Sequence, residues 1–153
     1  MGLVTGRGRP RFAVMTGRFD DPRAWRGQAV SLAEIEALAA RAYGRLPAHF
    51  RALCEDLVIR VEDFPTREAL DTMGLASRYE LLGLFQGIGL PFRQEVTGTM
   101  PNMIWLYRKP ILAYWTEHEE SLSAIVTHVL VHEIGHHFGF SDEDMEAIEA
   151  DAG

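Results

Sequence analysis

The sequence predicts an α+β domain, because helical and strand-like patterns follow one another along a chain of 153 residues. Two segments between residues 31 and 57 have helical spacing of apolar residues, several short strand-like segments follow, and a long apolar helix lies near the C-terminus. The length suits one domain, and 47% hydrophobic with 24% charged residues is typical of a globular protein. This order of elements predicts a sheet packed against helices.

Composition excludes several classes of protein. The formal net charge is −7, which disfavours a nucleic-acid partner held by general electrostatics. No apolar run approaches the length needed to span a bilayer, and the first residues lack the apolar core of a signal peptide. Cys54 is the single cysteine and forms no internal disulfide. We therefore expect a cytoplasmic protein with no membrane partner.

The first 30 residues differ from the rest of the chain. They hold six arginines against Asp20 and Asp21, a local balance of +4, with glycine or proline every few residues and no sustained period. The sequence therefore predicts a flexible basic N-terminal arm over residues 1–30 and one folded domain over 31–153.

Capping and spacing signals define the first two predicted helices. Ser31 is a candidate N-cap with Glu34 three residues later, and apolar residues at helical spacing follow to residue 46. Pro47 suits the first turn of a second helix that reaches residue 57, where Cys54 is expected to be a small core residue. Strands are predicted in LVIRVEDF (57–64), ELLGLFQGIGL (80–90) and MIWLYRKPILAYW (103–115).

The last long helix, about residues 119–138, contains the pattern HExxH. At about 100° per residue, His132 and His136 lie on one face and one turn apart, so both imidazoles can reach one metal ion. Glu133 projects about 100° from His132, in the position of a general base that faces a metal-activated water. His128 lies one turn earlier, and we expect it outside the ligand set.

The residues after this helix complete the set of ligands. Gly139 falls where the helix must end and suits a positive-φ turn, which returns the chain so that Asp142 approaches the histidines. Catalytic zinc usually has three protein ligands and one open position, and His132, His136 and Asp142 would supply two nitrogens and one oxygen. A terminal helix with Met145 facing inward is predicted next.

The motif resembles the metzincin pattern HExxHxxGxxH, with Asp142 in place of the third histidine. The chain is similar to a family of small bacterial zincin-like zinc metallopeptidases through VLVHEIGHHFGFSD, LPAHFRALCEDLVIRVEDFP, LLGLFQG and IWLYRKPIL, over about residues 31–150. The resemblance implies a minimal zincin-like fold, a small mixed sheet packed against an active-site helix and a backing helix. It also implies that His132, His136 and Asp142 bind zinc and that Glu133 is catalytic, but it implies no particular substrate.

Three functions of different classes follow from these residues. The first is a zinc-dependent metallopeptidase that hydrolyses a peptide or protein substrate by metal-activated water, with Glu133 as general base. The second is a metal-dependent endoribonuclease of the rRNA-maturation type, which the acidic net charge disfavours and the basic arm favours. The third is a non-catalytic metal-binding interaction module. For the peptidase, MIWLYRKP is the candidate strand for pairing with substrate, and Tyr107 or Arg108 is a candidate donor to the oxyanion.

Overall fold

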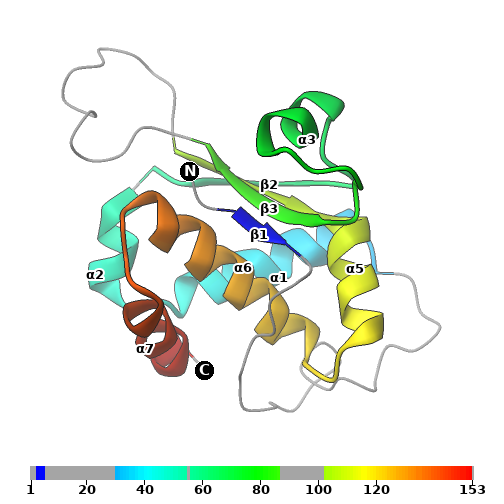
Figure 1. Ribbon diagram of the computed structural model, residues 1–153. Helices are drawn as coiled ribbons and strands as arrows, with labels where there is room; N and C mark the ends of the chain where they lie inside the picture. The colour runs from blue at the N-terminus through cyan, green and yellow to red at the C-terminus, as the bar shows by residue number, and fades with distance from the viewer. Residues whose placement is uncertain (1–2, 6–29, 55, 87–101, 153) are drawn as a thin grey trace.

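The framework of the fold is a four-stranded mixed sheet. Helices lie on both of its faces (Figure 1). The computed structural model describes residues 3–5, 30–54, 56–86 and 102–152. The α+β class predicted from the sequence is confirmed. The elements are β1 (Leu3–Thr5), α1 (Leu32–Gly44), α2 (Ala48–Arg51), the 3₁₀ helix η1 (Ala52–Cys54), β2 (Val58–Glu62), α3 (Arg67–Met73), β3 (Leu81–Gln86), β4 (Met103–Tyr107), α5 (Arg108–Glu117), α6 (Leu122–His137) and α7 (Asp142–Ala152).

The strand order is β1-β3-β4-β2, and the sheet is mixed. Strand β3 pairs antiparallel with both β1 and β4, whereas β2 pairs in parallel with β4. Within β4 the side chains alternate between two apolar clusters. Ile104 and Leu106 belong to the main core, whereas Trp105 and Tyr107 belong to a smaller cluster with Leu70 of α3. Both faces of β4 are therefore covered.

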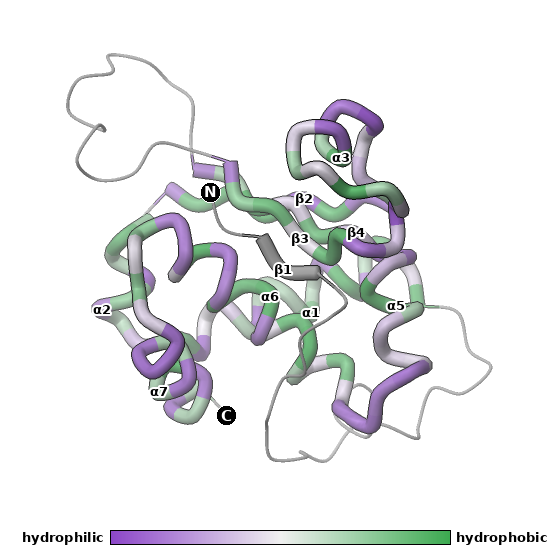
Figure 2. Tube along the Cα trace, in the orientation of Figure 1, coloured by the Kyte–Doolittle hydropathy of each residue, from purple (hydrophilic) through white to green (hydrophobic). Residues whose placement is uncertain are grey.

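Helix α6 lies at the centre of the main core, because it packs against α1, α5, α7 and three strands of the sheet. It is apolar along most of its length, in contrast to the mainly hydrophilic α7 (Figure 2). A Cβ added at Gly83 of β3 would lie 2.5 Å from Cγ1 of Val129 on α6. Glycine at position 83 therefore allows the helix to approach the sheet closely.

The predicted capping box of the first helix is present. Ser31 Oγ accepts the backbone N–H of Glu34, and Glu34 Oε1 accepts that of Ser31. The second predicted helix is shorter than expected, since α2 ends at Arg51 and continues as η1 to Cys54. Cys54 is fully buried, as predicted.

The strand predicted over residues 103–115 ends at Tyr107, and that prediction is wrong for the residues that follow. They form α5, in which Pro110 occupies the first turn, where its missing N–H costs no helical hydrogen bond. Ile111, Tyr114 and Trp115 are buried at helical spacing. The buried residues therefore alternate as in a strand up to Tyr107 and follow helical spacing after it.

The N-terminal region is only partly described. Leu3–Thr5 forms strand β1 at the edge of the sheet and contacts α6, although the sequence reading places these residues in a flexible arm. Backbone pairing with β3 therefore includes them in the sheet. The prediction for residues 6–29 falls outside the described residues. Among the helices of the described part, none is long and apolar enough to cross a membrane.

Candidate metal centre

The HExxH motif lies in the last two turns of α6, which has a defined beginning and end. Ser121 caps the N-terminus by accepting the backbone N–H of Ala124 at 3.0 Å. At the other end Gly139 has a φ of 81°, and the N–H of Phe140 donates to the carbonyl of Gly135 at 2.8 Å. This is a Schellman turn, and it confirms the positive φ predicted for Gly139.

The Schellman turn leads directly into α7. Ser141 Oγ accepts the backbone N–H of Asp144 at 3.1 Å and so caps this helix. Met145 and Ile148 are buried, at 0% and 4% exposure, as the sequence predicts for the inward face. Helix α7 therefore packs along the end of α6 that carries the motif.

The three predicted ligands lie in this region, but they are not equally close. The rings of His132 and His136 are 5.4 Å apart between centroids and nearly perpendicular. His136 Nε2 lies 4.0 Å from Asp142 Oδ1, and the Asp142 side chain is 88% exposed because it is the first residue of α7. His132 makes its close contact with a different carboxylate.

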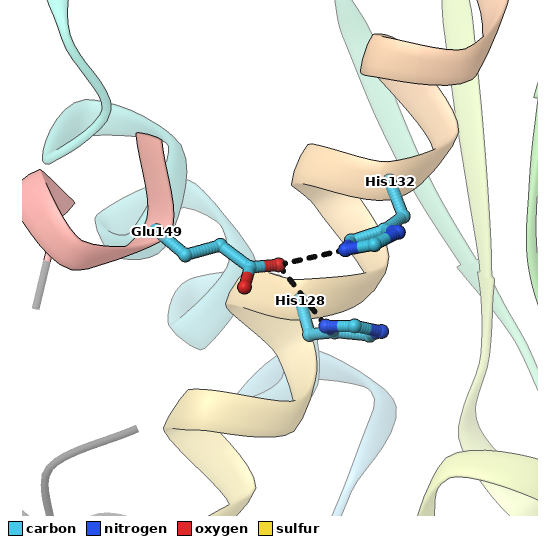
Figure 3. A group of neighbouring side chains, drawn as sticks. All are labelled: His128, His132 and Glu149. Atoms are coloured by element: carbon cyan, nitrogen blue, oxygen red, sulfur yellow. Dashed lines mark ion pairs between the residues drawn. The ribbon is translucent and has the colours of Figure 1, made fainter. Parts of the chain in front are cut away.

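That carboxylate is Glu149, on the buried face of α7. Its Oε1 lies 3.2 Å from His132 Nε2 and 3.0 Å from His128 Nδ1 (Figure 3). One ligand atom from each of these three residues lies within 4.8 Å of the others. The His128 and His132 rings lie 3.9 Å apart between centroids. The described part of the chain therefore brings together His128, His132 and Glu149, whose ligand atoms lie close enough to hold one metal ion.

Sequence reasoning missed two members of this group. It placed His128 outside the ligand set and did not single out Glu149. A signal for Glu149 exists, because it lies four residues after Met145 and next to Ile148, on the face of α7 that helical spacing predicts to be buried. A carboxylate on such a face is uncommon and requires a partner.

The charge of Glu149 is stabilised inside this group. Burial alone would raise the pKa of the Glu149 carboxyl, but hydrogen bonds with His128 and His132 outweigh burial and hold the pKa below its ordinary value. The pKa of the neighbouring His136 imidazole is also lowered. Burial and then the nearby His132 lower the pKa of His136, which favours the neutral imidazole that binds metal ions.

Glu133, the predicted general base, is fully buried between α6 and the sheet. Its Oε2 accepts the backbone N–H of Phe85 on β3 at 3.3 Å. Tyr107 lies near this carboxylate, and burial, with smaller contributions from Glu133 and Glu62, raises the pKa of its hydroxyl to about 12. Tyr107 is therefore a neutral, buried hydroxyl at ordinary pH.

Two predictions about substrate contacts need correction. Strand β4 contains most of MIWLYRKP, yet it lies inside the sheet between β3 and β2, so its backbone is already paired on both sides. Arg108 Nε donates to Asp63 Oδ1 at 2.7 Å, and its Nη1 donates to the carbonyl of Val30 at 2.8 Å. This guanidinium therefore anchors the start of α5 to the loops at Val30 and Asp63.

His137 and His118 make packing contacts with aromatic rings. The ring of His137 lies 4.2 Å from that of Phe85, measured between centroids. His118 stacks on Tyr114 at 3.7 Å and its Nδ1 donates to the Tyr114 carbonyl at 2.7 Å.

The chemistry of the donor groups fits a zinc-class ion. Imidazole nitrogens and a carboxylate oxygen are established zinc ligands, with bond lengths of about 2.0–2.2 Å. In a tetrahedral site such bonds place neighbouring ligand atoms about 3.3 Å apart. The distances of 3.0 and 3.2 Å around Glu149 are close to that value, and the 4.0 Å between His136 and Asp142 is somewhat longer.

Comparison with known proteins identifies the family. No curated protein matches the chain significantly. The model of the zincin-like metallopeptidase family matches residues 54–152, which is most of the chain and includes both strands β3 and β4, helix α6 and helix α7. Family membership suggests a metal-dependent peptidase and implies a metal ion, typically zinc. The chain belongs to the zincin-like metallopeptidase family.

Proposed function

We propose that this protein is a zinc-dependent peptidase in which Glu133 is the general base and His132, His136 and Asp142 hold the zinc ion. One arrangement carries the proposal. The two motif histidines occupy successive turns of α6, and the turn at Gly139 returns the chain so that Asp142 comes within 4.0 Å of His136. Membership of the zincin-like metallopeptidase family supports the class of reaction.

Access to the site also supports a peptide substrate. The side chain of His136 is 33% exposed and that of Asp142 is 88% exposed, so this end of α6 is open to solvent. A zinc ion, when bound, supplies a Lewis acid that polarises the scissile carbonyl and lowers the pKa of water. The carbonyl of an extended peptide can approach from this open side.

Glu133 has the proton-transfer role in the proposed reaction. It projects from α6 about 100° from His132, and the N–H of Phe85 fixes one of its oxygens. The carboxylate accepts a proton from the attacking water as the C–O bond forms. It then delivers this proton to the leaving amine as the C–N bond breaks, so the carboxylate is regenerated.

The test combines metal content with peptide cleavage. Protein purified without chelator is expected to contain about one zinc ion per chain by elemental mass spectrometry and to cleave members of a random peptide mixture. Glu133→Gln keeps the side-chain shape and an oxygen acceptor for Phe85, but it is a very poor base. We expect this variant to retain zinc and to lose peptide cleavage by about 10²- to 10⁴-fold.

Glu146→Gln is the matched control, because it makes the same chemical change at an exposed position of α7. It is expected to keep both zinc and activity, whereas His136→Ala is expected to lose peptide cleavage. Cleavage that is unchanged in Glu133→Gln would exclude the proposed role of Glu133. Metal-loaded protein that cleaves no peptide in the mixture would contradict the peptidase proposal itself.

A further inference from the structure

We infer that His128, His132 and Glu149 form a second metal-binding set for a zinc-class divalent cation, one helical turn before the predicted catalytic set and sharing His132 with it. This inference goes beyond the proposed peptidase function, which uses neither His128 nor Glu149. It rests on the geometry, burial and chemistry of the three side chains shown in Figure 3.

His128, His132 and Glu149 converge between helices α6 and α7. His128 and His132 are four residues apart on α6, so both rings project toward α7 from successive turns. Glu149 reaches between them from α7, and one of its oxygens is 3.0 Å from His128 Nδ1 and 3.2 Å from His132 Nε2. These separations match those of ligand atoms around a tetrahedral zinc ion, about 3.3 Å. Small shifts of the side chains would therefore accommodate an ion.

All three side chains are largely buried, and one of them is a carboxylate. The Glu149 side chain is 6% exposed, and the His128 and His132 side chains are 15% and 16% exposed. Burying a carboxylate is costly unless a positive or hydrogen-bonding partner compensates for the lost hydration. A divalent cation held jointly with two neutral imidazoles supplies that compensation more strongly than the imidazoles alone.

The carboxylate of this set is far more enclosed than the carboxylate of the predicted catalytic set. Asp142 is almost fully exposed and lies 4.0 Å from His136, whereas Glu149 is enclosed and contacts both of its histidines. Side chains held by surrounding packing lose less conformational freedom when they bind an ion. The set with Glu149 is therefore the more preorganised of the two.

The shared ligand has a functional consequence. The Nε2 atom of His132 lies toward Glu149, and a neutral imidazole has one unprotonated nitrogen, so it binds one ion at a time. An ion held by His128, His132 and Glu149 therefore removes His132 from the set with His136 and Asp142. We expect one zinc-class ion per chain, distributed between the two positions.

The decisive experiment replaces the two ligands that belong only to the predicted catalytic set, His136 and Asp142, and measures whether Zn²⁺ still binds. In the double variant His136→Gln/Asp142→Asn, both substitutions are at accessible side chains, so the fold is expected to persist and circular dichroism checks it. Zn²⁺ affinity is measured by competition with a chromophoric chelator. The inferred set predicts that this double variant still binds one Zn²⁺ per chain.

Adding Glu149→Gln to the double variant is then expected to weaken Zn²⁺ binding at least tenfold, since the substituted side chain offers only a neutral amide oxygen in place of a carboxylate. Glu146→Gln in the same background is the control and is expected to leave the affinity unchanged. Cobalt absorption gives a second readout, because the d–d bands of Co²⁺ report nitrogen and oxygen ligation even where no peptide is cleaved.

The outcomes separate this inference from the peptidase proposal. A folded double variant that binds no Zn²⁺ overturns the inference and leaves Glu149 as a hydrogen-bond partner of the two histidines. Binding that survives Glu149→Gln also overturns it. The peptidase proposal is judged on cleavage by the wild type and by Glu133→Gln, so either idea can fail while the other stands.

Discussion

Gly135 lies directly against Met145, at the point where α7 crosses the motif helix. A Cβ added at Gly135 would lie 2.5 Å from Met145 Sδ and 2.8 Å from its Cγ. Gly135 is the residue immediately before His136 within HExxH, so the glycine sets the distance between the motif and α7. The position of both carboxylates that face the histidines, Asp142 and Glu149, therefore depends on this close approach.

Gly135→Ala is expected to destabilise the protein by about 1–3 kcal/mol, because the added methyl group overpacks a fully buried contact with Met145. Urea unfolding followed by circular dichroism measures the change. Gly44→Ala is the matched control, since a Cβ there meets nothing within 4 Å. Equal stability of the two variants would contradict the role given to the Gly135 contact.

Replacing Glu133 is expected to affect the sheet as well as catalysis. Glu133→Ala removes the acceptor for the Phe85 N–H and leaves a buried donor, at a cost of about 1–3 kcal/mol. Glu133→Gln retains an oxygen that accepts this bond. Hydrogen exchange of the Phe85 amide is the measurement, and it should accelerate in Glu133→Ala far more than in Glu133→Gln. Equal protection in wild type and Glu133→Ala would show that the contact contributes nothing.

Stability is expected to fall at alkaline pH because of Tyr107. Burial raises the pKa of this hydroxyl from 10 to about 12, so the folded protein retains the proton at a pH where the unfolded chain has released it. The contribution is complete below pH 10 and is lost as the pH rises toward 12, with a slope of up to about 1.4 kcal/mol per pH unit.

Urea unfolding between pH 9 and about 12 tests this expectation. Tyr107→Phe should reduce the slope, whereas Tyr79→Phe, at a tyrosine that is 46% exposed, should retain it. A second contribution of the same sign comes from Tyr43, whose pKa is also raised by burial. A Tyr107→Phe slope identical to that of the wild type would contradict the assignment.

Local patterns were sufficient to predict much of the site. The spacing of His132 and His136 determines that they lie on one face of a helix, whatever the helix packs against. The turn at Gly139 was predictable for a similar reason, because a helix that ends before a polar segment favours glycine at positive φ. The capping box at Ser31 is also a local pattern, and it is present.

The sequence-based prediction failed in a segment whose local pattern is compatible with both a strand and a helix. The segment RKPILAYW is predicted as the second part of a strand that begins at Met103, although its buried positions Ile111, Tyr114 and Trp115 follow helical spacing. The order of the strands in the sheet also could not be predicted from local sequence patterns. Strand β4 lies between β3 and β2 because of long-range pairing, and this position removes it as a strand that could pair with a substrate.

The sequence by itself determined the helix, the motif and the turn, because each depends on residues within a few positions of one another. Only the tertiary structure decided which carboxylate lies closest to the histidines, since that depends on how α7 packs against α6. The contact of Gly135 with Met145 brings the buried face of α7 to α6, so Glu149, 17 residues after His132 in the sequence, comes within 3.2 Å of it. Packing between helices, rather than spacing along one of them, places His128 and Glu149 in contact.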